Sequence, residues 1–202
     1  MWMANEARKI LPNNSYPAKM YDFVRMCYQE GISWEDTRDM IYEKYQVNQE
    51  DGYDITSRNL YCNGCFAAGI NFAASIISLL YGEGDIKKTI KVGTLCGWDS
   101  DNPTATWGGL LGFMLGKKGI ETAFGRTFSG KYNIHRTRIG FPNNGIDTFT
   151  NMAEQGTLIV DKTIQREMGG KIDHEQDCWF IPAKAVDETF IFLVNSSSNS
   201  IR

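Results

Sequence analysis

Hydrophobic residues recur with helical spacing along most of the chain and predict a succession of α-helices. The first is expected over residues 16–30, where apolar side chains share one face and Gly31 follows as a stop signal. Ser33 opens a second helix with a capping-box-like sequence. Residues 60–80 are apolar nearly all round, which indicates a central helix surrounded by others. Asp85 is placed to cap a further short helix.

The pattern changes toward the C-terminus. Residues 126–145 are rich in Arg, Asn and Gly and predict irregular structure. A long helix is expected to begin with Asp147 as its cap and to close at Gly169. Residues 171–173 and 178–182 are expected to pair as a small β-hairpin.

Together these elements predict an all-α protein, mainly helical, with a small β appendage near the C-terminus. Residues 1–16 are polar and show no recognisable first element. The expected domain organisation is a helical domain over residues 1–170, the β appendage over residues 171–194, and a disordered tail over residues 195–202.

Composition and charge restrict the classes of function. The net charge of −3 gives no indication of binding to nucleic acid or to an anionic membrane. No apolar run is long enough to span a bilayer, and the first residues lack the basic start and apolar core of a signal peptide. Five cysteines at irregular spacing favour reduced thiols, which is typical of a cytoplasmic protein.

Two carboxylates one residue apart, those of Asp99 and Asp101, precede an Asn102-Pro103 step. Asn is a favoured N-cap and Pro a favoured first helical residue, so a helix is predicted from Pro103 to about Gly116. Both aspartates would then lie in the loop that leads into this helix. Hard divalent cations prefer carboxylate and neutral oxygen ligands. Asp99, Asp101 and Asn102 are therefore candidate metal ligands.

The same loop also has a purely structural interpretation, which the sequence leaves open. Aspartate is common before helices because its charge favours the positive helix end and its oxygens cap free N–H groups. An Asn102 oxygen used for capping would be less free to bind a metal. The loop does not match an EF-hand, because Thr104 occupies the turn-glycine position and Leu110 the position of the bidentate glutamate.

The helix that follows the loop is rich in small residues. Side chains this small would allow the helix to lie close beneath the loop. The small residues are Ala105, Gly108, Gly109 and Gly112.

Cys62 and Cys65 have the spacing of a redox or zinc-binding pair. With His174 and Cys178 they would make a four-ligand zinc set, although the two pairs lie far apart in the sequence. Buried reduced thiols are the alternative interpretation. His135 and His174 are the only histidines, and neither lies near a suitable nucleophile, which argues against triad hydrolysis.

A basic segment with interleaved aromatic residues follows residue 125. It suits contact with a phosphate-bearing ligand, and a solvated basic loop is the alternative. Its basic residues are Arg126, Lys131, His135, Arg136 and Arg138, interleaved with Phe128 and Tyr132.

Three motifs in a fixed order carry a family resemblance. They are the Leu-Leu-Tyr-Gly-Glu-Gly-Asp run of residues 79–85, the Gly-Trp-Asp-Ser-Asp sequence of residues 97–101, and the glycine-rich residues 108–112. This combination resembles the carboxy-terminal half of the ADP-ribosylglycohydrolase family, whose members are all-α. The similarity extends less specifically over residues 17–125.

The resemblance implies a binuclear magnesium site, with manganese in some members, of which Asp99, Asp101 and Asn102 would supply one half. The family usually has a hydroxyl residue where this chain has Asn102, so metal preference or affinity is expected to differ. The metals would orient the ribose and position a water for attack at the anomeric carbon, releasing ADP-ribose from a modified side chain. The implied partners are ADP-ribose or an ADP-ribosylated protein.

The other half of the family's site lies in an amino-terminal region with a Thr-Asp-Asp motif, and this chain contains no Asp-Asp pair. We therefore expect upstream helices, or a separate chain, to supply those ligands, and exposed apolar surface to drive self-association into a homo-oligomer. The chain alone is expected to bind magnesium weakly without turnover. The alternative is a noncatalytic ligand-binding or interaction module on the same helical scaffold.

Overall fold

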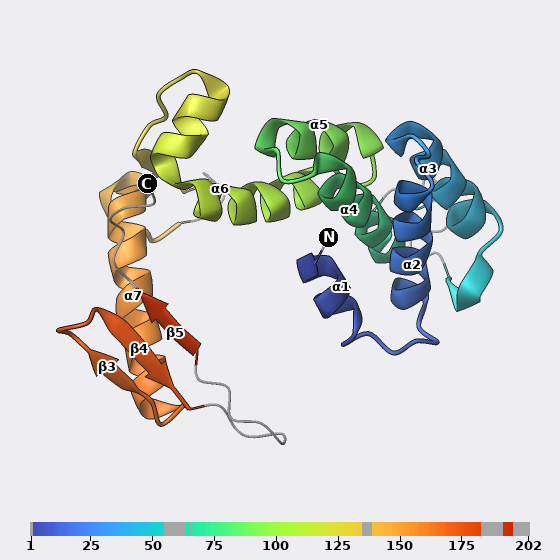
Figure 1. Cartoon of the computed structure of the whole chain (residues 1–202). Helices are drawn as coiled ribbons and strands as arrows, with labels where there is room; N and C mark the ends of the chain where they lie inside the picture. The colour runs from blue at the N-terminus through green and yellow to red at the C-terminus, as the bar shows by residue number, and fades with distance from the viewer. Residues whose placement is uncertain (1, 55–63, 65, 135–138, 183–191, 196–202) are drawn as a thin grey trace. The chain divides into compact units, whose positions relative to one another are not determined.

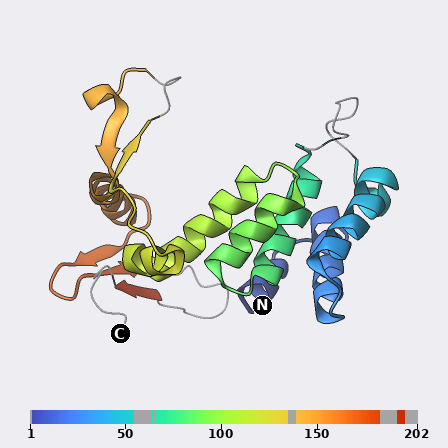
Figure 2. The same cartoon turned by 90° about the horizontal axis from the view of Figure 1, so that it is seen from above.

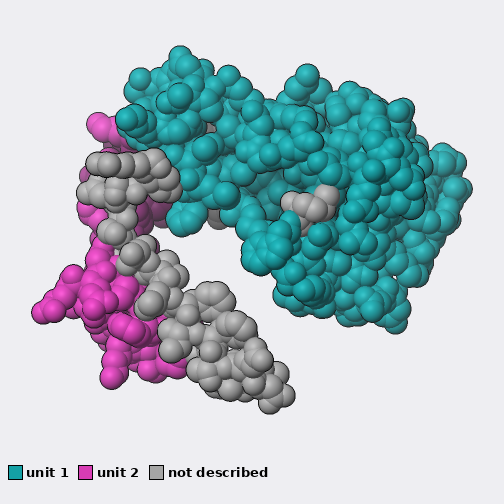
Figure 3. Space-filling model, in the orientation of Figure 1, with its two compact units in different colours: residues 1–127 teal, residues 128–202 magenta. Residues whose placement is uncertain are grey.

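The structure is a computed structural model that describes residues 2–54, 64, 66–134, 139–182 and 192–195. The chain is mainly helical, as predicted (Figure 1). It divides into two compact units, residues 1–127 and residues 128–202 (Figure 3). The helix before residue 170 packs against strands of the second unit. The domain organisation expected from the sequence stays a prediction.

The described residues of unit 1 are mainly helical. Its helices are α1 (Trp2–Arg8), α2 (Tyr16–Gln29), α3 (Trp34–Ile41), α4 (Ala68–Gly82), α5 (Ile86–Cys96) and α6 (Asp101–Phe124), with a π-helical turn η1 (Tyr42–Val47) and a 3-10 turn η2 (Glu50–Gly52). Two predicted helix starts are confirmed. The Ser33 side chain accepts a hydrogen bond from the Asp36 N–H, and Asp85 accepts one from the Lys88 N–H.

Helix α4 is the centre of unit 1, as its all-round apolar sequence predicts. It contacts α2, α3, α5 and α6, and Figures 1 and 2 show these helices side by side. It begins at Ala68, later than the expected residue 60, and residues 60–63 and 65 lie outside the described part of the chain. The largest fully buried apolar side chains in and around it include Met20, Val24, Ile41, Tyr45, Ile70 and Ile77.

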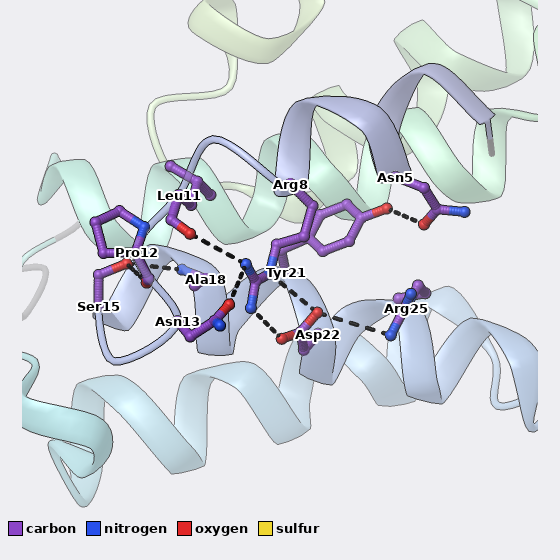
Figure 4. A network of polar contacts seen from close by, with 10 residues as sticks. All are labelled: Asn5, Arg8, Leu11, Pro12, Asn13, Ser15, Ala18, Tyr21, Asp22 and Arg25. Carbon is purple, nitrogen blue, oxygen red and sulfur yellow. Dashed lines mark hydrogen bonds and ion pairs between the residues drawn. The ribbon is translucent and has the colours of Figure 1, made fainter. Parts of the chain in front are cut away.

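Helix α1 is an element that the hydrophobic pattern did not predict. None of its seven residues is fully buried, although Ala4 packs against the core cluster, and a helix this short gives little helical period to detect in the sequence. Polar bonds also tie it to α2 (Figure 4). Tyr21 donates a hydrogen bond to Asn5 over 2.7 Å, and Arg8 holds both carboxylate oxygens of Asp22 at 3.2 and 2.7 Å.

The expected end of the helix at about Gly116 is confirmed by a break in the backbone of α6 there, where φ is 65°, and a further helical segment continues to Phe124. The helix begins at Asp101 rather than at the expected Pro103. The expectation that small residues bring this helix into close packing is wrong for Gly109, which has no atom within 4 Å of where a Cβ would lie. The close approach occurs at Gly93 of α5, where an added Cβ would lie 2.9 Å from the Ser78 hydroxyl.

Unit 2 combines one long helix, α7 (Phe149–Arg166), with short strands. The predicted hairpin is confirmed as β3 (Lys171–Asp173) and β4 (Cys178–Ile181), and β5 (Phe192–Asn195) adds a third antiparallel strand. Strands β1 (Lys131–Asn133) and β2 (Ile146–Thr148) also pair, so residues 126–145 are not wholly irregular.

Two smaller expectations about unit 2 are corrected. The N-cap of α7 is Thr148, not Asp147, and its hydroxyl accepts from the Asn151 N–H. The expected tail began at Asn195, which lies in β5, and the rest of that tail, residues 196–202, lies outside the described residues. Within the described part of the chain, no helix has the length and apolar character needed to cross a membrane.

Candidate functional site

The candidate site is the loop of residues 97–100 between α5 and α6, together with the first turn of α6. Helix α5 ends at Cys96, and Gly97 takes a left-handed backbone with φ of 89°. Asp99 is also left-handed, with φ of 50°, a conformation that Asp tolerates better than most residues. Ser100 is the N-cap of α6 and Asp101 is the first residue of the helix.

The capping interpretation of the loop is wrong for the Asn102 side chain. Asn102 lies inside α6, and no side chain makes a cap hydrogen bond at this helix start. No described residue donates a hydrogen bond to, or forms an ion pair with, the carboxylate of Asp99 or Asp101. Asp101 and Asn102 are exposed and Asp99 is half-buried. Within the described part of the chain, both carboxylates are thus without a partner near the positive end of α6.

The loop backbone is held by hydrogen bonds from two sides. The Asn71 amide of α4 donates to the carbonyl oxygens of Trp98 over 2.9 Å and of Asp99 over 3.2 Å. The Asn102 N–H donates to the same Asp99 oxygen over 3.0 Å. Thr104 donates its hydroxyl to the Ser100 carbonyl over 2.8 Å.

An aromatic pair flanks the loop. Tyr42, in the π-helical turn η1, stacks on Trp98 with ring centroids 5.9 Å apart and an interplanar angle of 15°. Single π-helical turns occur frequently at functional sites. Sequence analysis missed both Tyr42 and Asn71, although a lone Asn within an apolar helix is a detectable signal.

Carboxylate and amide oxygens are the right kind of donor for a hard cation, but the loop offers about three of them where such ions take six or more. Within the described residues, no group of three or more His, Cys, Asp or Glu side chains is arranged to hold a metal. The residues therefore fit a cation in donor chemistry and fall short of it in donor number.

The cysteine thiols give no alternative chemistry among the described residues. Cys96, directly before the loop, is buried, and burial raises the pKa of its thiol to about 12. Cys178 is buried on β4 while His174 is exposed. Cys62 and Cys65 lie outside the described residues.

The basic segment is only partly described. Lys131 lies exposed on β1, and Arg126 follows the end of α6. His135, Arg136 and Arg138 lie outside the described residues. A role of this segment in binding phosphate therefore stays a prediction.

A cavity of about 270 Å³ in unit 2 lies beside Tyr132, Phe141 and Asp147. The Asp147 carboxylate already accepts hydrogen bonds from the Thr148 N–H, the Asn151 amide and Tyr132, which lower the pKa of Asp147. Its oxygens are thus engaged within the protein.

Comparison with known proteins assigns the sequence to a family. The sequence model described as ADP-ribosylglycohydrolase matches residues 5–139, which include the whole of α2–α6 and the loop between α5 and α6. No curated protein and no solved structure matches the chain. Because the family model covers more than half of the sequence, the chain belongs to the ADP-ribosylglycohydrolase family.

Proposed function

We propose that this chain carries one side of a metal-dependent site that hydrolyses the bond between ADP-ribose and a modified side chain. The family acts on ADP-ribosylated substrates and is generally metal-dependent. The observation that carries the proposal is the pair of unpartnered carboxylates, Asp99 and Asp101, at the α5–α6 junction within the matched residues.

In this proposal Asp99, Asp101 and Asn102 hold one side of a Mg²⁺ or Mn²⁺ pair. When bound, such a pair polarises sugar hydroxyls and lowers the pKa of water, which suits attack at an anomeric carbon. The exposed carboxylate of Asp101 is accessible to an incoming ligand. Asn102 would contribute a neutral oxygen that cannot deprotonate, so the affinity depends chiefly on the two aspartates.

The chain contains no Asp-Asp pair, so the Thr-Asp-Asp sequence that the resemblance implies for the other side of the site is not present in it. About three oxygen donors leave a hard cation undercoordinated. We therefore propose that the chain by itself binds magnesium weakly and does not turn over. The same observation favours the second candidate, a noncatalytic module that binds ligand or protein on this helical scaffold.

Manganese-induced broadening of backbone amide signals in the labelled full chain tests the metal site. Mn²⁺ should broaden the signals of residues 98–102 in the wild type, and Asp99→Asn with Asp101→Asn should abolish the effect. Asp85→Asn is the matched control, because Asp85 also lies exposed at a helix N-terminus, where its carboxylate caps α5. Broadening that survives the double substitution, or disappears with Asp85→Asn, would contradict the proposal.

Release of ADP-ribose from a modified peptide, with and without Mg²⁺, separates the two candidates. The chain alone should release no ADP-ribose, because its half of the site is incomplete. Mg²⁺-dependent release that Asp101→Ala abolishes would show a complete site and contradict the half-site proposal. Binding of ADP-ribose without any manganese effect on the loop would favour the noncatalytic module.

A further inference from the structure

Asn71 is a polar side chain buried in the most apolar helix of the protein. It is 8 % exposed and lies in the second turn of α4, between Ile70 and the buried Ala73. Burying an amide costs free energy unless its hydrogen bonds are satisfied. Here the amide donates to two successive carbonyl oxygens, those of Trp98 and Asp99, and these frame the residue that carries the first carboxylate.

The loop that Asn71 holds has an uncommon backbone conformation. Gly97 and Asp99 are both left-handed, and Asp99 carries a Cβ in that conformation. Such conformations persist only where surrounding contacts fix them. Among the described residues, Asn71 is the only side chain outside the α5–α6 segment that hydrogen-bonds to the backbone of residues 97–100.

The other restraints come from the loop's own neighbourhood. The Asn102 N–H and the Thr104 hydroxyl both belong to the first turn of α6 and move with it. The stacking of Tyr42 on Trp98 fixes a side chain rather than the carbonyl of Asp99. Asn71 therefore joins the loop to the core, where α4 contacts α2, α3, α5 and α6.

We propose that Asn71 is a positioning residue, which fixes the backbone of Asp99 so that the carboxylates of Asp99 and Asp101 are presented together at the start of α6. The metal-binding part of this inference rests on the function proposed above. The part that concerns the loop backbone stands on the hydrogen bonds alone. Asn71 does not touch the ligand in this arrangement and acts only through Asp99.

The test uses the full chain with Asn71→Leu. Leucine has a similar branched shape but is apolar, so the substitution removes both N–H donors of the amide. Asn71→Asp is a second variant that keeps the shape and places a carboxylate against two carbonyl oxygens. Ser78→Ala is the matched control, because the Ser78 hydroxyl is also buried on α4 and donates to a backbone carbonyl, that of Thr89, over 2.8 Å. It lies away from the loop.

Hydrogen exchange of the Asn102 amide reports on the loop, because this N–H bonds to the Asp99 oxygen that Asn71 also holds. Asn71→Leu should accelerate that exchange about tenfold beyond any change at core amides of α4, as loss of a buried hydrogen bond predicts. Ser78→Ala should change the exchange of core amides without the additional acceleration at the Asn102 amide. Several-fold more Mn²⁺ should then be needed to broaden the loop signals in Asn71→Leu than in Ser78→Ala.

Equal Asn102 exchange in Asn71→Leu and Ser78→Ala, after correction for core exchange, would overturn the positioning role. If Asn71→Asp fails to fold, Asn71→Leu alone decides the outcome. If Mn²⁺ broadens no loop signal in the wild type, the proposed metal site is contradicted. The exchange comparison still tests whether Asn71 fixes the loop backbone.

Discussion

At the scale of single residues, Asp51 is a carboxylate that gathers several donors at the edge of the core. It is left-handed, with φ of 60°, and accepts a hydrogen bond from the buried Tyr45 hydroxyl over 2.9 Å. Lys19 and Lys44 each lie 3.4 Å from it. Burial acts to raise its pKa, but the Tyr45 bond and the Lys44 charge outweigh burial and leave the pKa below its ordinary 3.8.

Asp51→Asn should lower the free energy of unfolding by about 1 kcal/mol at pH 7, because it removes a charged acceptor while Asn still tolerates the left-handed backbone. A carboxyl whose folded pKa is depressed stabilises the protein above its unfolded pKa and loses that contribution as pH falls through the folded value. The difference between variant and wild type should therefore fade below pH 3.8. Urea unfolding at several pH values measures it.

Asp39→Asn is the control for this comparison. The Asp39 carboxylate is 67 % exposed in its ion pair with Arg38, so its loss should change stability little. A wild-type advantage over Asp51→Asn that grows on acidification would contradict the account of Asp51.

Residue types alone predict local roles well where the partner is close in sequence. The caps at Ser33 and Asp85 follow from spacing because the N–H they accept from lies three residues away. Asn71 was not found this way, since its partners at Trp98 and Asp99 become neighbours only after α4 and α5 pack. The carboxylates of the loop were found, and their backbone support was not.

At the scale of elements, glycine marks where helices approach most closely. At Gly82, the last residue of α4, an added Cβ would lie 2.0 Å from the Thr89 hydroxyl and 2.8 Å from its Cα. At Gly109, in the first half of α6, the same atom would meet nothing within 4 Å. Replacement of glycine by alanine is therefore expected to have opposite effects on stability at these two positions.

Gly82→Ala should destabilise the protein by about 1–3 kcal/mol, because the Thr89 backbone cannot move aside without shifting α5. Gly109→Ala should stabilise it by about 0.5–1 kcal/mol, because alanine loses less conformational freedom in a helix than glycine. Urea unfolding followed by circular dichroism measures both. Destabilisation by Gly109→Ala would contradict the open space found beside Gly109.

Element interiors were more predictable than element ends. The apolar residues of α2, α4 and α5 recur with helical spacing in the sequence, because each helix buries a face. This spacing predicts the middle of each helix. Helix α1, which has seven residues and none fully buried, was missed. Helix α6 begins at Asp101, two residues before the expected start, with Ser100 in the N-cap position and no side-chain cap hydrogen bond.

At the scale of the whole molecule, the two units differ in how much apolar surface they bury. The described core cluster, from Met20 to Cys96, belongs entirely to unit 1. Among the described residues of unit 2, the buried hydrophobic side chains are those of Ile164 and Cys178. Burial of apolar surface is the main favourable contribution to folding, so unit 1 should account for most of the stability.

A fragment of residues 1–127 should therefore fold without unit 2. Its helical circular dichroism should be retained, and its cooperative urea midpoint should match that of the full chain. An amide spectrum that overlays the unit 1 signals of the full chain is the control for native structure. A fragment that lacks a cooperative transition would show that unit 2 completes the core.

The family assignment also belongs to this scale, because the match spans most of unit 1 and reaches residue 139. The ordered motifs of residues 79–112 were sufficient to indicate the family from the sequence. The division between the units was not predictable in this way. It depends on α7 packing against β2 and β3. Strand β3 was predicted from its pattern, but β2, which is three residues long, was not.

The central claim is that Asp99 and Asp101 form one side of an incomplete metal site. Calorimetric titration of the chain with Mg²⁺ tests it most directly. The account predicts weak binding, with a Kd above about 1 mM, that Asp101→Ala weakens further. Tight binding that Asp101→Ala abolishes would contradict it, because this chain would then hold a complete site.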